Sequence, residues 1–201
     1  MIQNSGRLIV FEGWDGSGKT TLAKLCCDLL NSQGKEAHYL AFPGQMRGTL
    51  GLHIHKLHHD PTYAAIDVIH PASLQILHIA AHVDSIESTI LPALQRGEWI
   101  VLDRYWWSTR AYGIASGVNP KALDMMIDLE LLFWKSVRPK AVFLVSRPTA
   151  SCASTDAFEM QVSAEYERLA ERESKNLPVH RISNARAAQD VADEIVKIAL
   201  A

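Results

Sequence analysis

The chain has 201 residues, 48% of them hydrophobic and 21% charged, with a formal net charge of −2. This size and composition fit one compact domain over residues 1–201 and exclude a disordered or fibrous protein. The near-neutral charge lacks the basic excess of proteins that wrap nucleic acid, so we expect small-molecule partners and no nucleic acid.

Strand-like apolar runs alternate with helical patterns along the chain. We expect strands at residues 7–12, 36–42, 98–103, 140–145 and 178–182. Helical patterns lie near residues 18–32, 48–57, 72–94, 119–135, 157–175 and 187–200. A further helix starts at Trp106 and Trp107, which could close over a ligand but are interpreted as packing anchors. This alternation is typical of βαβ units and predicts an α/β fold with a mostly parallel sheet. Residues 146–157 are small and polar without periodicity, which predicts a short lid loop.

Membrane and export signals are missing from these patterns. No apolar run reaches the roughly 18–20 residues of a membrane span, and the first ten residues lack the pattern of a signal peptide. We therefore expect no membrane association and a cytoplasmic location.

A glycine-rich segment, GWDGSGKTT, follows the first expected strand and opens the first expected helix. It matches the phosphate-binding pattern GxxxxGK[ST], in which inward-facing backbone N–H groups and the start of the helix bind phosphate oxygens. Lys19 would reach the β- and γ-phosphates, and the Thr20 hydroxyl would hold Mg²⁺. The sequence thus predicts a site for ATP and Mg²⁺ built from Gly13, Trp14, Asp15, Gly16, Ser17, Gly18, Lys19, Thr20 and Thr21.

The third expected strand ends in WIVLDRY. It delivers Asp103 and Arg104 to the carboxyl edge of the sheet, where ligands bind in open α/β folds. Asp103 could hold the water shell of the metal, and Arg104 could bind a second phosphate bidentately. A strand-end salt bridge is the alternative for this pair.

Four segments together resemble the thymidylate kinases of the nucleoside monophosphate kinase group. They are FEGWDGSGKTT from residue 11, FPG from 42 followed by RGTLG from 47, PALQRGEWIVLDRY from 92, and STRAYG from 108. The resemblance implies a P-loop NTPase fold, with a five-stranded parallel sheet flanked by helices on both faces, in a homodimer. It also implies transfer of the γ-phosphate of ATP to dTMP with Mg²⁺.

The same resemblance implies individual roles. Asp15 would lie near the acceptor sugar or the metal, and the donor adenine would lie near a late loop that ends at Arg186. Arg47 and Arg104 would bind the acceptor phosphate, while Ser108 and Tyr112 would lie near the base and deoxyribose. The implied acceptor site is completed by Phe42, His78 and His82.

His78 and His82 stand where the family has a phenylalanine that stacks on thymine and an arginine that donates to a thymine carbonyl. Arginine can only donate a hydrogen bond, whereas a neutral histidine donates from one nitrogen and accepts at the other. The two histidines, four apart on one helical face, either contact the acceptor base or pack in the core. The base preference therefore stays open.

The expected lid also departs from the family, whose members with a glycine at the position of Gly16 carry arginines in this loop. Here the loop offers only Arg147, the remaining candidate for a catalytic residue beside Lys19, Asp15 and Arg104. Arg168 and Arg172 on the following helix either substitute for the lid arginines or form a solvated face. Without a transition-state arginine, phosphoryl transfer typically loses about 10³–10⁵ in rate.

Three functions remain in competition. The first is the ATP- and Mg²⁺-dependent phosphorylation of a nucleoside monophosphate, with dTMP as the expected acceptor. The second is a polyphosphate-dependent nucleotide kinase, suggested by EGWDGSGK and DRYWW, and the third is a catalytically weak nucleotide-binding module. His55 and His59 share a helical face and could bind a metal, although their segment is typical of an amphipathic helix end.

Overall fold

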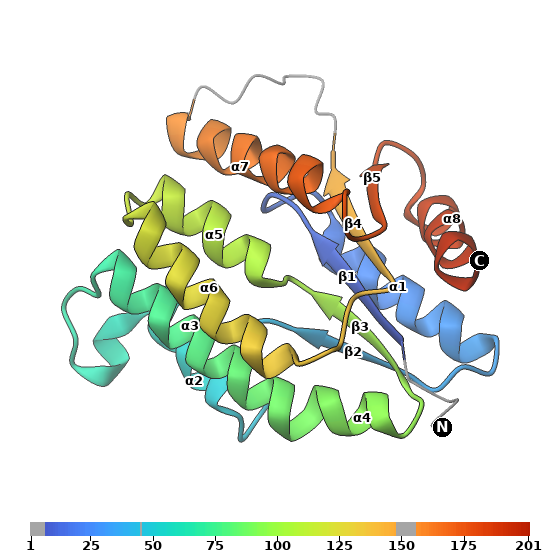
Figure 1. Cartoon of the computed structure of the whole chain (residues 1–201), viewed down its shortest axis with the longest axis horizontal. Helices are drawn as coiled ribbons and strands as arrows, with labels where there is room; N and C mark the ends of the chain where they lie inside the picture. Colours follow the sequence, from blue (N-terminus) through green and yellow to red (C-terminus); the bar gives the residue numbers. More distant parts are fainter. Residues whose placement is uncertain (1–6, 45, 148–155) are drawn as a thin grey trace.

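The computed structural model describes residues 7–44, 46–147 and 156–201. At its centre lies a parallel sheet in the order β2 (Ala37–Ala41), β3 (Trp99–Asp103), β1 (Arg7–Glu12), β4 (Ala141–Ser146) and β5 (Val179–Ser183). Because β1 is the middle strand, with β3 and β4 on its two sides, the loop that follows it leaves the sheet at its centre (Figure 1). The carboxyl ends of all these strands meet at one edge, which is where the phosphate-binding motif begins.

Helices cover both faces of the sheet, since successive strand residues point to opposite sides. Ile9 and Phe11 pack in the core beneath α1 (Lys19–Ser32) and α8 (Ala188–Leu200). Leu8 and Val10 belong to the second core, which the helices of the opposite face cover (Figure 1). These elements are α3 (Pro71–Ser85), the π-helical turn η2 (Ile86–Ile90), α4 (Leu91–Gln95), α5 (Trp106–Ala115), α6 (Pro120–Trp134) and α7 (Ala157–Glu173).

Two short elements complete this second face. Helix α2 (Leu50–His59) and the 3₁₀ turn η1 (Pro61–Ala64) follow β2, and α2 packs against α3. The start of α2 is set by Thr49, whose hydroxyl accepts a hydrogen bond from the Leu52 N–H at 3.3 Å. Such a side-chain cap satisfies a donor that the first helical turn leaves unpaired. The cap fixes where α2 begins beside the sheet edge.

The long helix expected at residues 72–94 is present, but it is not a regular α-helix throughout. Helix α3 runs directly into η2 and then α4. Pro92, near the start of α4, has no N–H to donate to the Ser88 carbonyl one turn earlier, and the wider π-helical turn lies immediately before it. The sequence pattern predicted the helix and missed this change in winding.

The predicted fold class is confirmed: the structure is an α/β fold with a five-stranded parallel sheet between helices. The expected strand and helix boundaries shift by one or two residues at most ends, and η1 was not expected. Residues 148–155 of the expected lid lie outside the described residues. Within the part that the structure describes, no helix is long and apolar enough to cross a membrane.

Candidate functional site

The glycine-rich loop forms a tight turn between β1 and α1. Gly13 (φ +142°) and Gly18 (φ +87°) adopt backbone conformations that residues with a side chain rarely take. A Cβ atom at Gly13 would lie 2.3 Å from the Val145 carbonyl oxygen, and one at Gly18 would lie 2.2 Å from Asn184 Nδ2. The amide of Asn184 also donates to the Ser17 carbonyl at 2.9 Å, which holds the loop from its outer side. The loop is thus packed to a shape that only these glycines allow.

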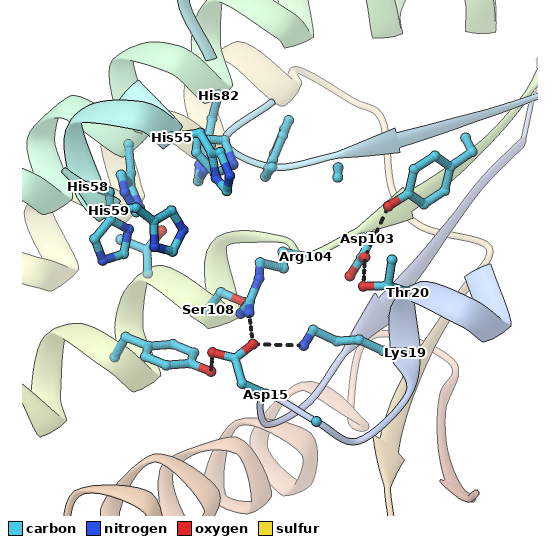
Figure 2. A pocket seen from close by; sticks show the side chains of 18 of the residues that line it. Asp15, Lys19, Thr20, His55, His58, His59, His82, Asp103, Arg104 and Ser108 are labelled. Atoms are coloured by element: carbon cyan, nitrogen blue, oxygen red, sulfur yellow. Dashed lines mark hydrogen bonds and ion pairs between the residues drawn. The ribbon is translucent and has the colours of Figure 1, made fainter. Parts of the chain in front are cut away.

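Asp15 contacts two positively charged side chains, Lys19 and Arg104, at this loop (Figure 2). Its Oδ1 atom contacts Lys19 Nζ at 3.3 Å and also forms an ion pair with Arg104 Nη2. Its Oδ2 atom accepts a hydrogen bond from the Tyr112 hydroxyl at 2.7 Å. Partial burial opposes ionisation, but Arg104, Tyr112 and Lys19 hold the pKa of Asp15 below its usual value. Lys19 and Arg104, expected on two different phosphates, therefore meet at one carboxylate.

The residues predicted to bind the metal lie side by side. The Thr20 hydroxyl donates to Asp103 Oδ2 at 2.5 Å, and the Tyr39 hydroxyl donates to the same oxygen at 3.2 Å. The second oxygen of Asp103, Oδ1, is buried without a hydrogen-bond partner among the described residues. A hydroxyl beside a buried, incompletely satisfied carboxylate is a donor set that suits Mg²⁺. Thr20 and Asp103 are thus the residues that fit this ion.

Arg104 follows β3 in a left-handed conformation (φ +75°) that is uncommon for a residue with a side chain. Its N–H donates to the Phe11 carbonyl at 2.9 Å, and its guanidinium lies over the Tyr112 ring at 5.2 Å and donates to Ser108 Oγ at 3.2 Å. These contacts hold the charged end of Arg104 against the start of α5. The geometry agrees with a residue that presents its charge to the sheet edge.

Glu12 was not singled out from the sequence, yet it organises the start of α5. Its buried carboxylate accepts hydrogen bonds from the N–H groups of Tyr105 and Ser108 at 2.7 and 3.1 Å, and from the hydroxyls of Ser108 and Tyr166 at 2.7 and 3.2 Å. Helix α5 has no cap from its own side chains, so Glu12 takes that place. Burial raises the pKa of Glu12 to about 7, against the hydrogen bonds and the charge of Arg104.

The phosphate loop and the residues at the end of β3 line one end of a cavity of about 510 Å³. The opposite end is lined by histidines, with Arg104 between the two ends in Figure 2. The lining residues from the phosphate loop and the sheet edge include Asp15, Gly16, Gly18, Lys19, Thr20, Asp103 and Arg104. One cavity therefore joins the phosphate-binding end to a polar, aromatic end, as a site for two nucleotides requires.

At the far end, His82 is buried between an aromatic ring and a carboxylate. Its ring stacks on Phe42, with centroids 4.0 Å apart and planes 10° from parallel. Its Nδ1 atom lies 2.9 Å from Glu130 Oε2. His78 lies one turn earlier on α3, and burial together with His82 and His58 lowers the pKa of His78 to about 2. Both histidines line the cavity, as the acceptor-base hypothesis expected.

Three more histidines at this end come from α2. His55, His58 and His59 line the cavity, and the His58 ring centroid lies 5.0 Å from that of His78. Burial and the neighbouring His59 lower the pKa values of His55 and His58. Among the described residues, the group of three histidine, cysteine or acidic side chains that lie close enough to hold a metal together is Glu36, His38 and Glu98, near the amino ends of β2 and β3, and it includes neither His55 nor His59. The signal available in the sequence was the helical spacing of HIHKLHHD, which aligns these rings on one face.

Seven predicted residues are not among those that line the cavity: Gly13, Trp14, Ser17, Thr21, Arg47, Arg147 and Arg186. Arg47 and Thr21 are exposed and do not line it, and Arg147 is exposed where β4 ends. Arg186 forms an ion pair with Glu194 on α8. Their assignments to the acceptor phosphate, the donor or the transition state stay predictions.

Two predicted residues are occupied by protein contacts. The Ser108 hydroxyl lines the cavity but is taken up by Glu12, Tyr166 and Arg104, so it supports the cavity wall more directly than it offers a free group to a base. Trp14 stacks on Tyr112 with ring centroids 6.0 Å apart. Trp106 and Trp107 are buried in the core, as expected of packing anchors.

Comparison with known proteins identifies the family that this chain resembles. The family model for thymidylate kinase matches residues 11–198. The thymidylate kinase of Gluconobacter oxydans is 33% identical over 176 residues, covering 82% of this chain and 78% of its own. That of Neorickettsia sennetsu is 31% identical over 198 residues, covering 94% and 92%. A crystal structure of thymidylate kinase from Ehrlichia chaffeensis superimposes with a TM-score of 0.78 at 22% identity, over 96% of this chain and 98% of that one. Because the family model covers nearly the whole chain and a relative 33% identical is covered over more than two thirds of both chains, the chain belongs to the thymidylate kinase family.

Proposed function

We propose that the protein transfers the γ-phosphoryl group of ATP to the phosphate of dTMP, forming dTDP. The observation that carries this proposal is the meeting of Lys19 and Arg104 at one oxygen of Asp15. Lysine from a phosphate loop serves the donor, and an arginine beside it can bind the acceptor phosphate bidentately. Two phosphates held by these two cations would approach each other in the middle of the cavity, as phosphoryl transfer requires.

The residues around this point supply positioning and charge. The loop N–H groups and the start of α1 bind the donor phosphates, and Lys19 neutralises the charge that shifts during transfer. Burial lowers the pKa of Lys19, and the charge of Arg104 acts in the same direction, while Asp15 and Asp103 oppose both effects. When bound by Thr20 and Asp103, Mg²⁺ would neutralise further phosphate charge. Tyr112 would close the wall beside the acceptor sugar.

The surface of α6 supports a homodimer. Met125, Leu129 and Leu132 share one face of this helix and are 51–73% exposed. Ile76 on the neighbouring α3 is 54% exposed. A row of apolar side chains on two packed helices is typical of a subunit interface. Light scattering after gel filtration should give twice the 22.3 kDa mass of the chain, and Leu132→Glu should shift it to the monomer.

A coupled ADP-release assay across dTMP, dUMP, dCMP, dGMP and UMP tests the activity and separates a kinase from a weak nucleotide-binding module. We expect turnover with dTMP. Lys19→Ala should lower kcat/KM by at least about 100-fold, because it removes a charge from the reacting phosphates. Lys35→Ala, at an exposed position outside the cavity lining, is the matched control and should leave the rate unchanged. Nucleotide binding without turnover in the parent would contradict the proposal.

A further inference from the structure

A buried chain of hydrogen bonds runs behind the histidine end of the cavity. The indole N–H of Trp134 donates to Glu130 Oε1 at 3.2 Å, and Glu130 Oε2 lies 2.9 Å from Nδ1 of His82. Trp134 and Glu130 are fully buried, and His82 is 3% exposed. The three residues come from α6 and α3, which pack against each other. Water is therefore excluded from both oxygens of Glu130, and each oxygen has a fixed neighbour.

This chain decides which nitrogen of His82 carries the proton. An ionised carboxylate can only accept hydrogen bonds, so the proton of a neutral imidazole beside Glu130 lies on Nδ1. Nε2 then keeps its lone pair. The Phe42 ring stacks on the imidazole of His82, with ring centroids 4.0 Å apart. Rotation of the imidazole would break this stacking contact, so the contact holds the imidazole in its orientation.

The Nε2 edge of His82 lies on the side of the ring away from Glu130 and belongs to the cavity wall. His82 lines the cavity, whereas Glu130 and Trp134 do not. Because Nδ1 points to Glu130, the other nitrogen lies on the opposite side of the ring. Within the described part of the chain, no hydrogen bond joins Nε2 to another residue. Nε2 of His82 is thus a hydrogen-bond acceptor in the cavity wall, on a buried ring whose orientation is fixed.

We propose that Glu130 is a positioning residue that holds His82 with an unprotonated Nε2 toward the cavity, so that His82 accepts a hydrogen bond from an N–H of the acceptor base. This inference rests on the proposed function. In dTMP the pyrimidine carries a single N–H, at N3, whereas cytosine carries a lone pair there. Where Nε2 faces position 3 of the base, an acceptor atom favours thymine over cytosine, because a lone pair facing a lone pair leaves both groups unsatisfied. Cytosine could satisfy Nε2 only by presenting its exocyclic amine instead, which requires a shifted position of the base.

The variant Glu130→Gln tests the proposal, because the hydrogen bond from Trp134 determines the orientation of the glutamine side-chain amide. The indole N–H needs an acceptor, so the amide oxygen stays toward Trp134 and the NH₂ group faces His82 Nδ1. Nδ1 must then accept, and the proton moves to Nε2, which becomes a donor at almost unchanged volume. The ratio of kcat/KM for dTMP to that for dCMP should fall by about 10- to 100-fold. Glu165→Gln is the matched control, a buried glutamate on α7 that pairs with Arg110 and does not line the cavity, and it should keep the parent ratio.

Nitrogen-15 NMR of the imidazoles reads the proton directly in the nucleotide-free protein, with His82→Gln assigning the signals. We expect a protonated Nδ1 and an unprotonated Nε2 in the parent, and the reverse in Glu130→Gln. A proton on Nε2 of the parent, in either the other tautomer or the imidazolium, would overturn the proposal. So would an unchanged or increased dTMP to dCMP ratio in a folded Glu130→Gln variant. If the parent turned over no nucleotide, the proposed function would fail, while NMR and calorimetric binding of dTMP and dCMP would still decide the position of the proton.

Discussion

Replacing Glu12 by glutamine tests the cap of α5 and the charge that it buries. Burial raises the pKa of Glu12 from 4.5 to about 7, so the folded protein retains this proton at a pH where the unfolded chain has released it. The contribution of Glu12 to the free energy of unfolding therefore falls as pH rises from about 5 to 8. Linkage sets the loss from this group at about 2 to 3 kcal/mol over that range.

Glutamine mimics the protonated carboxyl group. Its oxygen can accept from the N–H groups of Tyr105 and Ser108, and its NH₂ group can donate to the hydroxyl oxygen of Ser108 or Tyr166. The variant thus keeps the cap but does not titrate. Relative to the parent, Glu12→Gln should gain about 2 to 3 kcal/mol of unfolding free energy between pH 5 and pH 8.

Urea unfolding of both proteins at pH 5, 6, 7 and 8 measures this difference. The comparison between the two proteins is essential because His78 acts with the opposite sign. The pKa of His78 is lowered to about 2, so the unfolded chain binds a proton below pH 6.5 that the folded protein does not, and stability is lost as pH falls. That contribution is common to parent and variant and cancels. A stability difference that stays constant with pH would refute the assigned burial of a titrating Glu12.

Three further predictions follow from the same contacts. Relative to the parent, His78→Phe should gain about 1 to 2 kcal/mol of unfolding free energy as pH falls from 7 to 5, measured by urea unfolding, because it removes the buried base. A difference that does not change with pH would contradict the assignment. Gly51→Ala should destabilise the protein by about 1–3 kcal/mol and raise the KM for the acceptor, because the new Cβ would lie 2.1 Å from the carbonyl oxygen of Pro43, which lines the cavity. Thermal unfolding measures the loss, and an unchanged melting temperature would contradict the prediction. Arg104→Ala should lower kcat/KM for dTMP by about 100-fold with little change in ATP affinity. Arg47→Ala should have a smaller effect, because Arg47 is exposed and does not line the cavity. Equal effects of the two variants would assign Arg47 to the acceptor phosphate.

The phosphate-binding end of the site could be predicted because its signal is local. Glycines, lysine and threonine at fixed spacing between a strand and a helix define a turn whose backbone binds phosphate. Asp103 is the last residue of β3, which pairs with β1 in the sheet. The family membership and the fold that this motif suggested are confirmed. The polyphosphate-dependent alternative finds no support in these matches.

The other end depends on contacts between distant residues and could be predicted only in part. His78 and His82 were found because their spacing places them on one helical face. Glu130 lies 48 residues beyond His82 and looks, in its own helix, like an ordinary exposed glutamate. Glu12 was likewise hidden, because nothing local distinguishes a strand-end carboxylate that caps a helix 93 residues away. The role of Arg47 was implied by the family resemblance alone, and it stays a prediction, because the side chain is exposed and does not line the cavity.

The cap of α5 by Glu12 also bears on how the protein can open and close. The strand that ends at Glu12 continues directly into the phosphate loop, and the helix that Glu12 caps carries Ser108 and Tyr112. The donor side and this wall of the acceptor side are therefore parts of a single stiff frame anchored in the sheet core. Separating them would break several buried hydrogen bonds at once. Helix α2 lies outside that frame: its histidines line the cavity, while its backbone packs on another helix, α3, and not on the strand that carries the phosphate loop.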